Sequence, residues 1–164
     1  MKKIILIVSF LLLVCQGQFL CAAYSSSLRT VHSVKPRYIS LAPSTTEILF
    51  ALGLNEEIVG VSTFCNYPKE AKLKPKVGDF SQPNMEKIIF LHPDYIFCTG
   101  LEQAPVIAEL KRFGLNVYVA DPAGIKDLFN TIIDIGEITN KTKEARELIK
   151  KMSEDIETIN ALVK

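Results

Sequence analysis

The stretch YISLAPSTTEILFALG, residues 38–53, contains two patterns of apolar residues in succession. Its first four residues form an uncharged, largely apolar run, which is typical of a buried strand in a parallel sheet. From Ser44 to Leu52 the spacing is helical, and Gly53 stands where a left-handed helix cap is favoured. Ser44 and Glu47 match a capping box, in which each side chain binds a backbone N–H at the helix start. The stretch therefore predicts a strand that leads directly into a helix.

The alternation of strand and helix continues along the chain. Short β-branched or aromatic runs stand at 58–61, 95–98 and 117–119, and helical patterns lie at 85–91, 102–113 and 125–135. Continuously apolar strands that alternate with helices indicate a parallel sheet covered on both faces. The sequence predicts an α/β fold, a Rossmann-like three-layer lobe with a mainly parallel sheet.

The beginning of the chain has the pattern of an export signal. A short positive start precedes an apolar run over residues 4–14, which is too short to span a bilayer. We expect residues 1–23 to be a signal peptide and the Ser-rich residues 24–36 to be a flexible leader. A retained membrane helix and a lipid anchor on Cys21 or Cys15 stay open as alternatives. The expected location is the periplasm or the outer face of the cytoplasmic membrane.

The composition of the remainder is that of an ordinary soluble domain. Without Lys2 and Lys3, the 19 basic residues fall to 17 against 18 acidic residues, so no basic excess favours nucleic acid as a partner. The length suffices for one hydrophobic core. Cys65 and Cys98 lack the spacing of a metal knuckle or a redox pair. We expect two buried free thiols, although an exported protein also permits a disulfide between them.

The loops that leave the carboxyl ends of parallel strands form the binding edge of such a sheet. In this sequence they offer hydroxyls, an amide, an aromatic ring and backbone N–H groups, which are supplied by Ser44, Thr45, Asn66, Tyr67 and Gly100. These groups suit an uncharged or weakly anionic ligand with flat apolar faces. A purely structural role at the helix start stays open for Ser44 and Thr45.

Four segments in order carry a resemblance to a known family. The family is that of the cobalamin and iron-chelate solute-binding proteins. Its opening strand and helix resemble residues 39–53, and its second strand and pocket loop resemble residues 59–68. The resemblance continues in order through residues 76–88 and 91–96. The resemblance extends over residues 37–164 and is strongest to the cobalamin-binding branch. Four motifs in sequence are more specific than any one of them.

The resemblance implies two lobes joined by one long helix, with the ligand held between them and left chemically unchanged. It also implies delivery of the ligand to an ABC permease driven by its ATPase. Phe64 and Phe80 match positions of pocket aromatics in the corrinoid-binding branch, where the family often has Tyr or Trp. Glu86 matches the acidic residue of the first lobe that docks onto the permease.

The last predicted element is one long helix over residues 140–164. Apolar residues recur along one stripe of it, namely Ala145, Leu148, Ile149, Met152, Ile156, Ile159 and Val163. A helix of this length matches the interlobe helix of the family. We therefore expect a ligand-binding lobe over 37–139, the interlobe helix over 140–164, and no second lobe in this chain. A separate chain that supplies the second lobe stays open.

Two other functions stay open beside that of a corrinoid importer. A ferric siderophore or haem would fit the same family, and Tyr67 is the plausible donor to haem iron from this half. A secreted α/β hydrolase is the remote alternative, since Ser44, Glu47 and His92 supply hydrolase residue types. The Gly-x-Ser-x-Gly elbow of such enzymes is missing. We expect no catalytic residues, no cofactor and no metal site.

Overall fold

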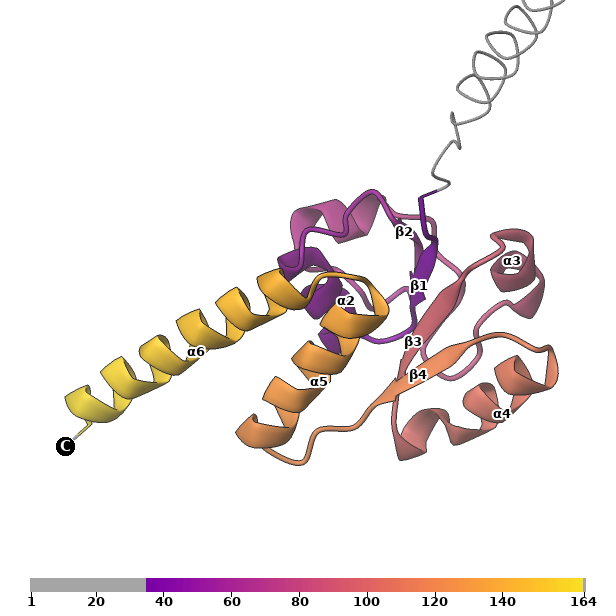
Figure 1. Ribbon diagram of the computed structural model, residues 1–164. Helices are drawn as coiled ribbons and strands as arrows, with labels where there is room; N and C mark the ends of the chain where they lie inside the picture. The colour runs from indigo at the N-terminus through magenta and orange to yellow at the C-terminus, as the bar shows by residue number, and fades with distance from the viewer. Residues whose placement is uncertain (1–34, 164) are drawn as a thin grey trace, which may run out of the picture. The chain divides into compact units, whose positions relative to one another are not determined.

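The computed structural model describes residues 35–163 as a layered α/β unit (Figure 1). Four parallel strands form one sheet in the order β2-β1-β3-β4. The strands are β1 (Tyr38–Ser40), β2 (Ile58–Val61), β3 (Tyr95–Thr99) and β4 (Val117–Ala120). The predicted α/β class and the parallel sheet are confirmed. The expected signal peptide, and the leader as far as residue 34, lie outside the described residues.

Helices cover both faces of the sheet, as the sequence predicts (Figure 1). Helices α2 and α5 lie on one face, and α3 and α4 lie on the other. Their bounds are α2 (Pro43–Ala51), α3 (Met85–Phe90), α4 (Ala104–Arg112), α5 (Ile125–Ile138) and α6 (Thr142–Leu162), with 3-10 turns η1 (Lys69–Leu73) and η2 (Leu101–Gln103). The result is a three-layer lobe followed by a long helix.

Alternate residues of the strands supply two separate cores, because successive side chains of a strand point to opposite faces. Ile39 and Ile96 pack with Leu110 beneath α3 and α4. Phe97 packs on the opposite face, where its ring centroid lies 5.8 Å from that of Tyr38 and 6.0 Å from that of Tyr118. Each core is completed by the helices of its own side.

Burial also changes the acidity of two side chains in these cores. Burial, with a hydrogen bond donated by the Tyr118 hydroxyl to Asp134 Oδ2 at 2.9 Å, raises the pKa of Tyr118 to about 12. Burial alone raises the pKa of Cys98 to about 12. Cys65 and Cys98 are both free and buried, as predicted.

Prolines move two helix starts away from their predicted positions. The expected capping box of Ser44 and Glu47 is wrong, because α2 begins at Pro43 after Ala42 and has no side-chain cap. Proline favours the first helical position, so Ser44 lies within the first turn. Pro105 has the same effect in α4, and the expected single helix over 102–113 is divided into η2 and α4. The turn η1 was not predicted.

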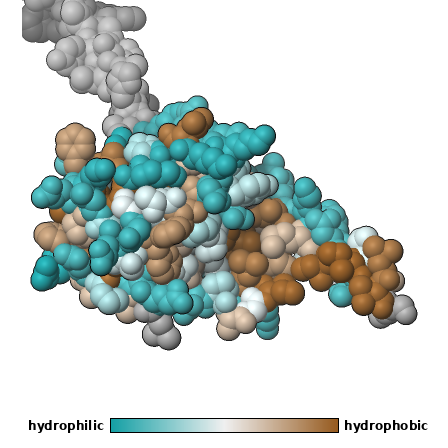
Figure 2. Space-filling view, turned by 180° about the vertical axis from the view of Figure 1, so that it is seen from behind, coloured by the Kyte–Doolittle hydropathy of each residue, from teal (hydrophilic) through white to brown (hydrophobic). Residues whose placement is uncertain are grey.

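Helix α6 packs on α5 through its first half only. Ala145 is fully buried against Gly136, and a β-carbon at Gly136 would lie 2.7 Å from that of Ala145. Toward the end of the helix, Leu162 and Val163 are each 82% exposed. Figure 2 shows apolar surface along the projecting helix. Within residues 35–163, none of the helices combines the length and hydropathy needed to cross a membrane.

Candidate ligand-binding site

The strand order places a switch point between β1 and β3. The chain runs from β1 outward to β2 on one side, and it later adds β3 and β4 on the other side. Ligands of open α/β sheets bind outside the carboxyl ends of the strands at such a point. A cavity of about 540 Å³ lies there, which we call the switch-point cavity. It is lined by Ala42, Pro43, Ser44, Phe80, Thr99, Gly100, Glu102 and Asp121.

The switch-point cavity brings together three of the residues predicted for the ligand site. Ser44 is exposed in the first turn of α2, Phe80 is half-buried on the loop before α3, and Gly100 follows β3. Thr45 points elsewhere, because its side chain is fully buried and its hydroxyl donates to the Ala42 carbonyl at 3.1 Å. The hydroxyl of Thr45 is therefore committed to the protein interior.

The loop after β2 carries the other three predicted residues outside the lining of this cavity. Phe64 and Tyr67 are 58% and 65% exposed, and Asn66 is exposed as well. Tyr67 lines a neighbouring cavity of about 370 Å³ between α2, α5 and α6. Ser44 lines both cavities, so the two hollows adjoin at the start of α2.

A buried network of hydroxyls and a thiol fastens that loop to β1 and α2. Thr46 Oγ1 lies 2.8 Å from Ser40 Oγ and 3.0 Å from Cys65 Sγ. Ser40 Oγ lies 2.7 Å from Thr45 Oγ1, and Ser62 Oγ lies 3.2 Å from Cys65 Sγ. All five side chains are fully buried. The sequence analysis missed this network, although Ser, Thr and Cys follow both strands.

The turn that carries Phe80 is built from local backbone chemistry. Gly78 adopts a φ of +108°, which favours glycine, and a β-carbon there would lie 2.7 Å from the backbone nitrogen of Asn84. Asp79 Oδ1 then accepts hydrogen bonds from the backbone N–H groups of Ser81 and Gln82 at 2.9 and 2.5 Å. This turn brings Phe80 to the edge of the cavity.

Gln103 was also missed by the sequence analysis, and it lies fully buried behind the cavity lining. Its Oε1 accepts from the backbone N–H of Thr99 at 2.8 Å. Its Nε2 donates to the carbonyl of Phe80 at 2.8 Å and, at 3.4 Å, to that of Leu41. One amide thus joins three segments that surround the cavity.

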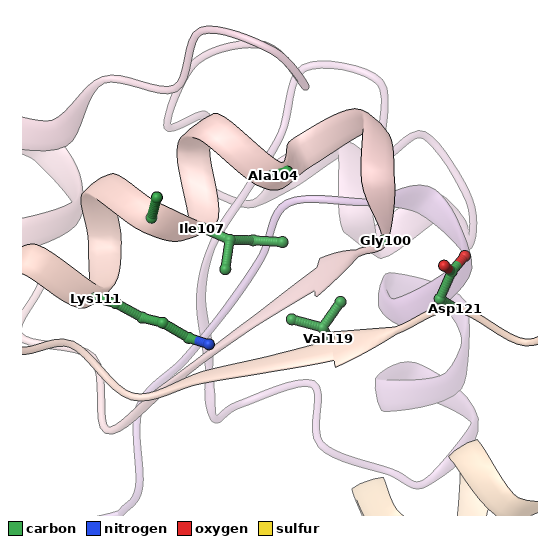
Figure 3. Close-up of a pocket in the computed structure, with 7 residues that line it drawn as sticks. Gly100, Ala104, Ile107, Lys111, Val119 and Asp121 are labelled. Carbon is green, nitrogen blue, oxygen red and sulfur yellow. The ribbon is translucent and has the colours of Figure 1, made fainter.

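A shallow groove continues from the switch-point cavity along the outer edge of the sheet (Figure 3). It lies between α4 and β4, and Gly100 and Asp121 line both the groove and the cavity. The carboxylate of Asp121 lies directly over Gly100, so a β-carbon at Gly100 would require the exposed Asp121 side chain to move. Lys111 and Asp121 stand at opposite ends of the groove in Figure 3. The cavity itself is lined by two carboxylates and no basic side chain.

Glu86, the residue predicted to dock on a permease, lies away from this lining and is exposed in the first turn of α3. That helix is capped by Asn84, whose Oδ1 accepts from the backbone N–H of Lys87 at 2.8 Å. In the part of the chain that the structure describes, no group of three or more His, Cys, Asp or Glu side chains could hold a metal ion.

Comparison with known proteins agrees with this architecture. The sequence profile of the periplasmic binding protein family matches residues 39–164. The chain belongs to this family. One relative is YvrC from Bacillus subtilis (strain 168), an uncharacterised ABC transporter substrate-binding lipoprotein. It is 37% identical to this chain over 139 residues, which are 82% of this chain and 44% of the relative. A vitamin B12-binding protein from Vibrio parahaemolyticus is 30% identical over 84% of this chain and 50% of its own length.

Solved structures give the same result for the fold. The crystal structure of a possible iron-binding, periplasmic solute-binding protein from Staphylococcus epidermidis has a TM-score of 0.72 and 36% sequence identity. The match covers 78% of this chain and 51% of that protein. The resemblance to cobalamin and iron-chelate solute-binding proteins is confirmed, and the hydrolase alternative has no support. The chain spans about half the length of the relatives it matches.

Proposed function

We propose that this chain is the substrate-binding component of an ABC importer and that its ligand is a corrinoid such as cobalamin. The observation that carries the proposal is the switch-point cavity, which joins an aromatic ring to the carboxyl ends of β1 and β3. Relatives described as a vitamin B12-binding protein and an ABC substrate-binding lipoprotein support the assignment.

The charges around the cavity favour a corrinoid over haem. Glu102 and Asp121 are exposed carboxylates of the lining, and at neutral pH they accept hydrogen bonds but cannot donate them. The peripheral amides of a corrinoid donate N–H groups to such oxygens, whereas the propionates of haem would place like charges together. Phe80 offers a flat apolar surface to either ring. An amide-bearing ring therefore complements this lining better than a carboxylate-bearing one.

The chain supplies one wall of the ligand site in this proposal. One lobe covers one face of a flat ligand, so the buried area is small compared with the entropy lost on binding. We expect a dissociation constant for cyanocobalamin weaker than about 1 µM. A second lobe on a separate chain would raise the affinity when added.

Equilibrium dialysis of the purified chain against cyanocobalamin, haemin and a ferric hydroxamate tests the ligand assignment. We expect Phe80→Ala to remove most of the corrinoid binding, because the ring supplies apolar contact area. Phe90→Ala is the matched control, since Phe90 is 80% exposed on α3 and outside the cavity lining. Phe64→Ala tests whether the exposed aromatic of the neighbouring loop also contacts the ligand. Nanomolar haemin binding, or no corrinoid binding at all, would refute the assignment.

We further propose that the chain acts on the outer side of the cytoplasmic membrane, where Glu86 docks on a basic pocket of the permease. Glu86 is exposed and takes part in no ion pair among the described residues. Glu86→Lys should weaken capture of the detergent-solubilised permease while the melting temperature stays unchanged. Glu137→Lys makes the same charge change on α5 as a control, and equal loss of capture by both variants would contradict a specific contact.

A further inference from the structure

Gln103 uses every hydrogen-bonding position of its side-chain amide inside the lobe. Oε1 accepts from Thr99 N at 2.8 Å and from Thr99 Oγ1 at 3.3 Å, while Nε2 faces the carbonyls of Phe80 and Leu41. The opposite orientation of the amide would turn its oxygen toward two carbonyl oxygens, which cannot donate. The assignment of oxygen and nitrogen is therefore fixed by the partners.

The partners of this amide belong to three segments that are far apart in the sequence. Leu41 follows β1, Thr99 ends β3, and Phe80 stands on the turn before α3. The lining of the switch-point cavity is drawn from the same three segments and from the end of β4. Gln103 itself is absent from that lining and fully buried. It can act on a ligand only through the segments it holds.

The turn that carries Phe80 is joined to the rest of the lobe through the Gln103 side chain. Asp79 closes the turn on itself through Ser81 and Gln82. Within residues 35–163, the Gln103 amide supplies the hydrogen bond that joins residues 79–82 to another part of the lobe. The base of the turn is held separately, because the backbone N–H of Thr63 donates to the Gly78 carbonyl at 2.9 Å. Without the Gln103 bond the turn would keep this base and its internal shape, but Phe80 would lose its fixed position relative to β1 and β3.

We propose that Gln103 is the positioning residue of the ligand site. Its buried amide holds the Phe80 turn against the ends of β1 and β3, so that the aromatic wall is in place before the ligand arrives. A wall fixed in advance loses less conformational entropy on binding. This inference rests on the proposed function, because it concerns the cavity in which the corrinoid would bind.

The substitution Gln103→Glu makes the hydrogen bond to the Phe80 carbonyl depend on pH, while the acceptor for Thr99 remains. Above the pKa of the introduced carboxyl, an acceptor still serves Thr99, but no donor remains for the carbonyl of Phe80. Protonation restores one O–H donor at the same place, and burial moves that protonation toward neutral pH. We expect cyanocobalamin affinity to fall about tenfold or more at pH 7.5 and to return to within about threefold of wild type at pH 5.

Gln103→Met is the uncharged companion variant, because it keeps the length and burial of the side chain without any strong hydrogen bond. Its affinity should be low at both pH values. Gln82→Glu is the matched control, since Gln82 is exposed on the same turn and its side chain makes no hydrogen bond within the described residues. It should change affinity less than about twofold. Circular dichroism at each pH reports whether every variant is folded.

The outcomes distinguish this inference from the proposed function. Wild-type affinity retained by folded Gln103→Glu and Gln103→Met would overturn the positioning role, and so would a loss in Gln103→Glu that does not recover at pH 5. If Gln103→Glu unfolds at pH 7.5, the cyanocobalamin affinities of Gln103→Glu and Gln103→Met are compared at pH 5 alone. At that pH only Gln103→Glu should bind. Wild type that binds no cyanocobalamin at either pH refutes the proposed function and this inference with it.

Discussion

Thr46→Val tests the buried network that fastens the loop after β2. The substitution removes one hydroxyl and leaves a side chain of nearly the same shape. Thr46 Oγ1 lies 2.8 Å from Ser40 Oγ, 2.9 Å from the Ala42 carbonyl and 3.0 Å from Cys65 Sγ, and the residue is fully buried. A hydroxyl has one proton, so it donates to one of these atoms and accepts from others.

The magnitude follows from what the remaining groups can still do. Loss of a buried partner costs about 1–3 kcal/mol for each group left unsatisfied. Ser40 Oγ retains Thr45 Oγ1 at 2.7 Å, and Cys65 Sγ retains Ser62 Oγ at 3.2 Å, so the network can reorganise around the gap. We therefore expect Thr46→Val to lower the free energy of unfolding by about 1–2 kcal/mol, in the lower part of that range.

Urea denaturation followed by circular dichroism measures this change, and the melting temperature should fall by roughly 2–8 °C. Thr63→Val is the matched control in the same loop, because Thr63 is exposed, and it should alter stability by less than about 0.5 kcal/mol. Thr46→Ser keeps the hydroxyl and isolates the contribution of the methyl group. A loss below about 0.5 kcal/mol in Thr46→Val would show that the hydroxyl does not stabilise the loop, contrary to this reasoning.

Three other residues give separate tests of the fold. Gly136→Ala should destabilise the chain by about 1–3 kcal/mol in a urea melt, because the new methyl would lie 2.7 Å from the β-carbon of Ala145. Burial raises the pKa of Tyr118 from 10 to about 12. The stability that the protonated Tyr118 hydroxyl contributes is therefore intact below pH 10 and is lost between pH 10 and 12. In urea titrations over this alkaline range, Tyr118→Phe should show a smaller decline in the free energy of unfolding. Burial raises the pKa of Cys98 to about 12, so its alkylation at pH 8 should proceed only at the rate of unfolding. Rapid labelling of Cys98 in the native chain, located by peptide mass spectrometry, would contradict the packing.

The class of fold could be predicted from the sequence because its signals are local. Each strand is a short apolar run and each helix a periodic one, and Gly53 and Gly114 end their helices with positive φ values of 77° and 74°. The errors lie at helix starts, where one proline decides between neighbouring positions. Pro43 displaced the expected cap at Ser44 in this way. Local patterns therefore identify the elements but place their first turns less accurately.

The candidate site could be predicted only in part, because its supports are contacts between distant residues. The binding edge follows from strand order, and Ser44, Phe80 and Gly100 do line the cavity there. Gln103 meets partners that are 62 and 23 positions away in the sequence, and no pattern around it distinguishes it from a surface glutamine of a helix start. Its role becomes visible only when three loops are folded together.

Support and recognition draw on the same loops, and this limits which groups can reach a ligand. The hydroxyl of Thr45 suits a polar ligand by residue type, yet it lies in the interior and bonds to Ser40 and to the carbonyl of Ala42. The loop hydroxyls that brace the site are then unavailable for recognition. Polar contacts with a ligand must come from groups that the network leaves free, which in the switch-point cavity include Ser44, Glu102 and Asp121. Two of these three are acceptors only at neutral pH, so a ligand rich in N–H donors complements this wall better than one rich in carboxylates.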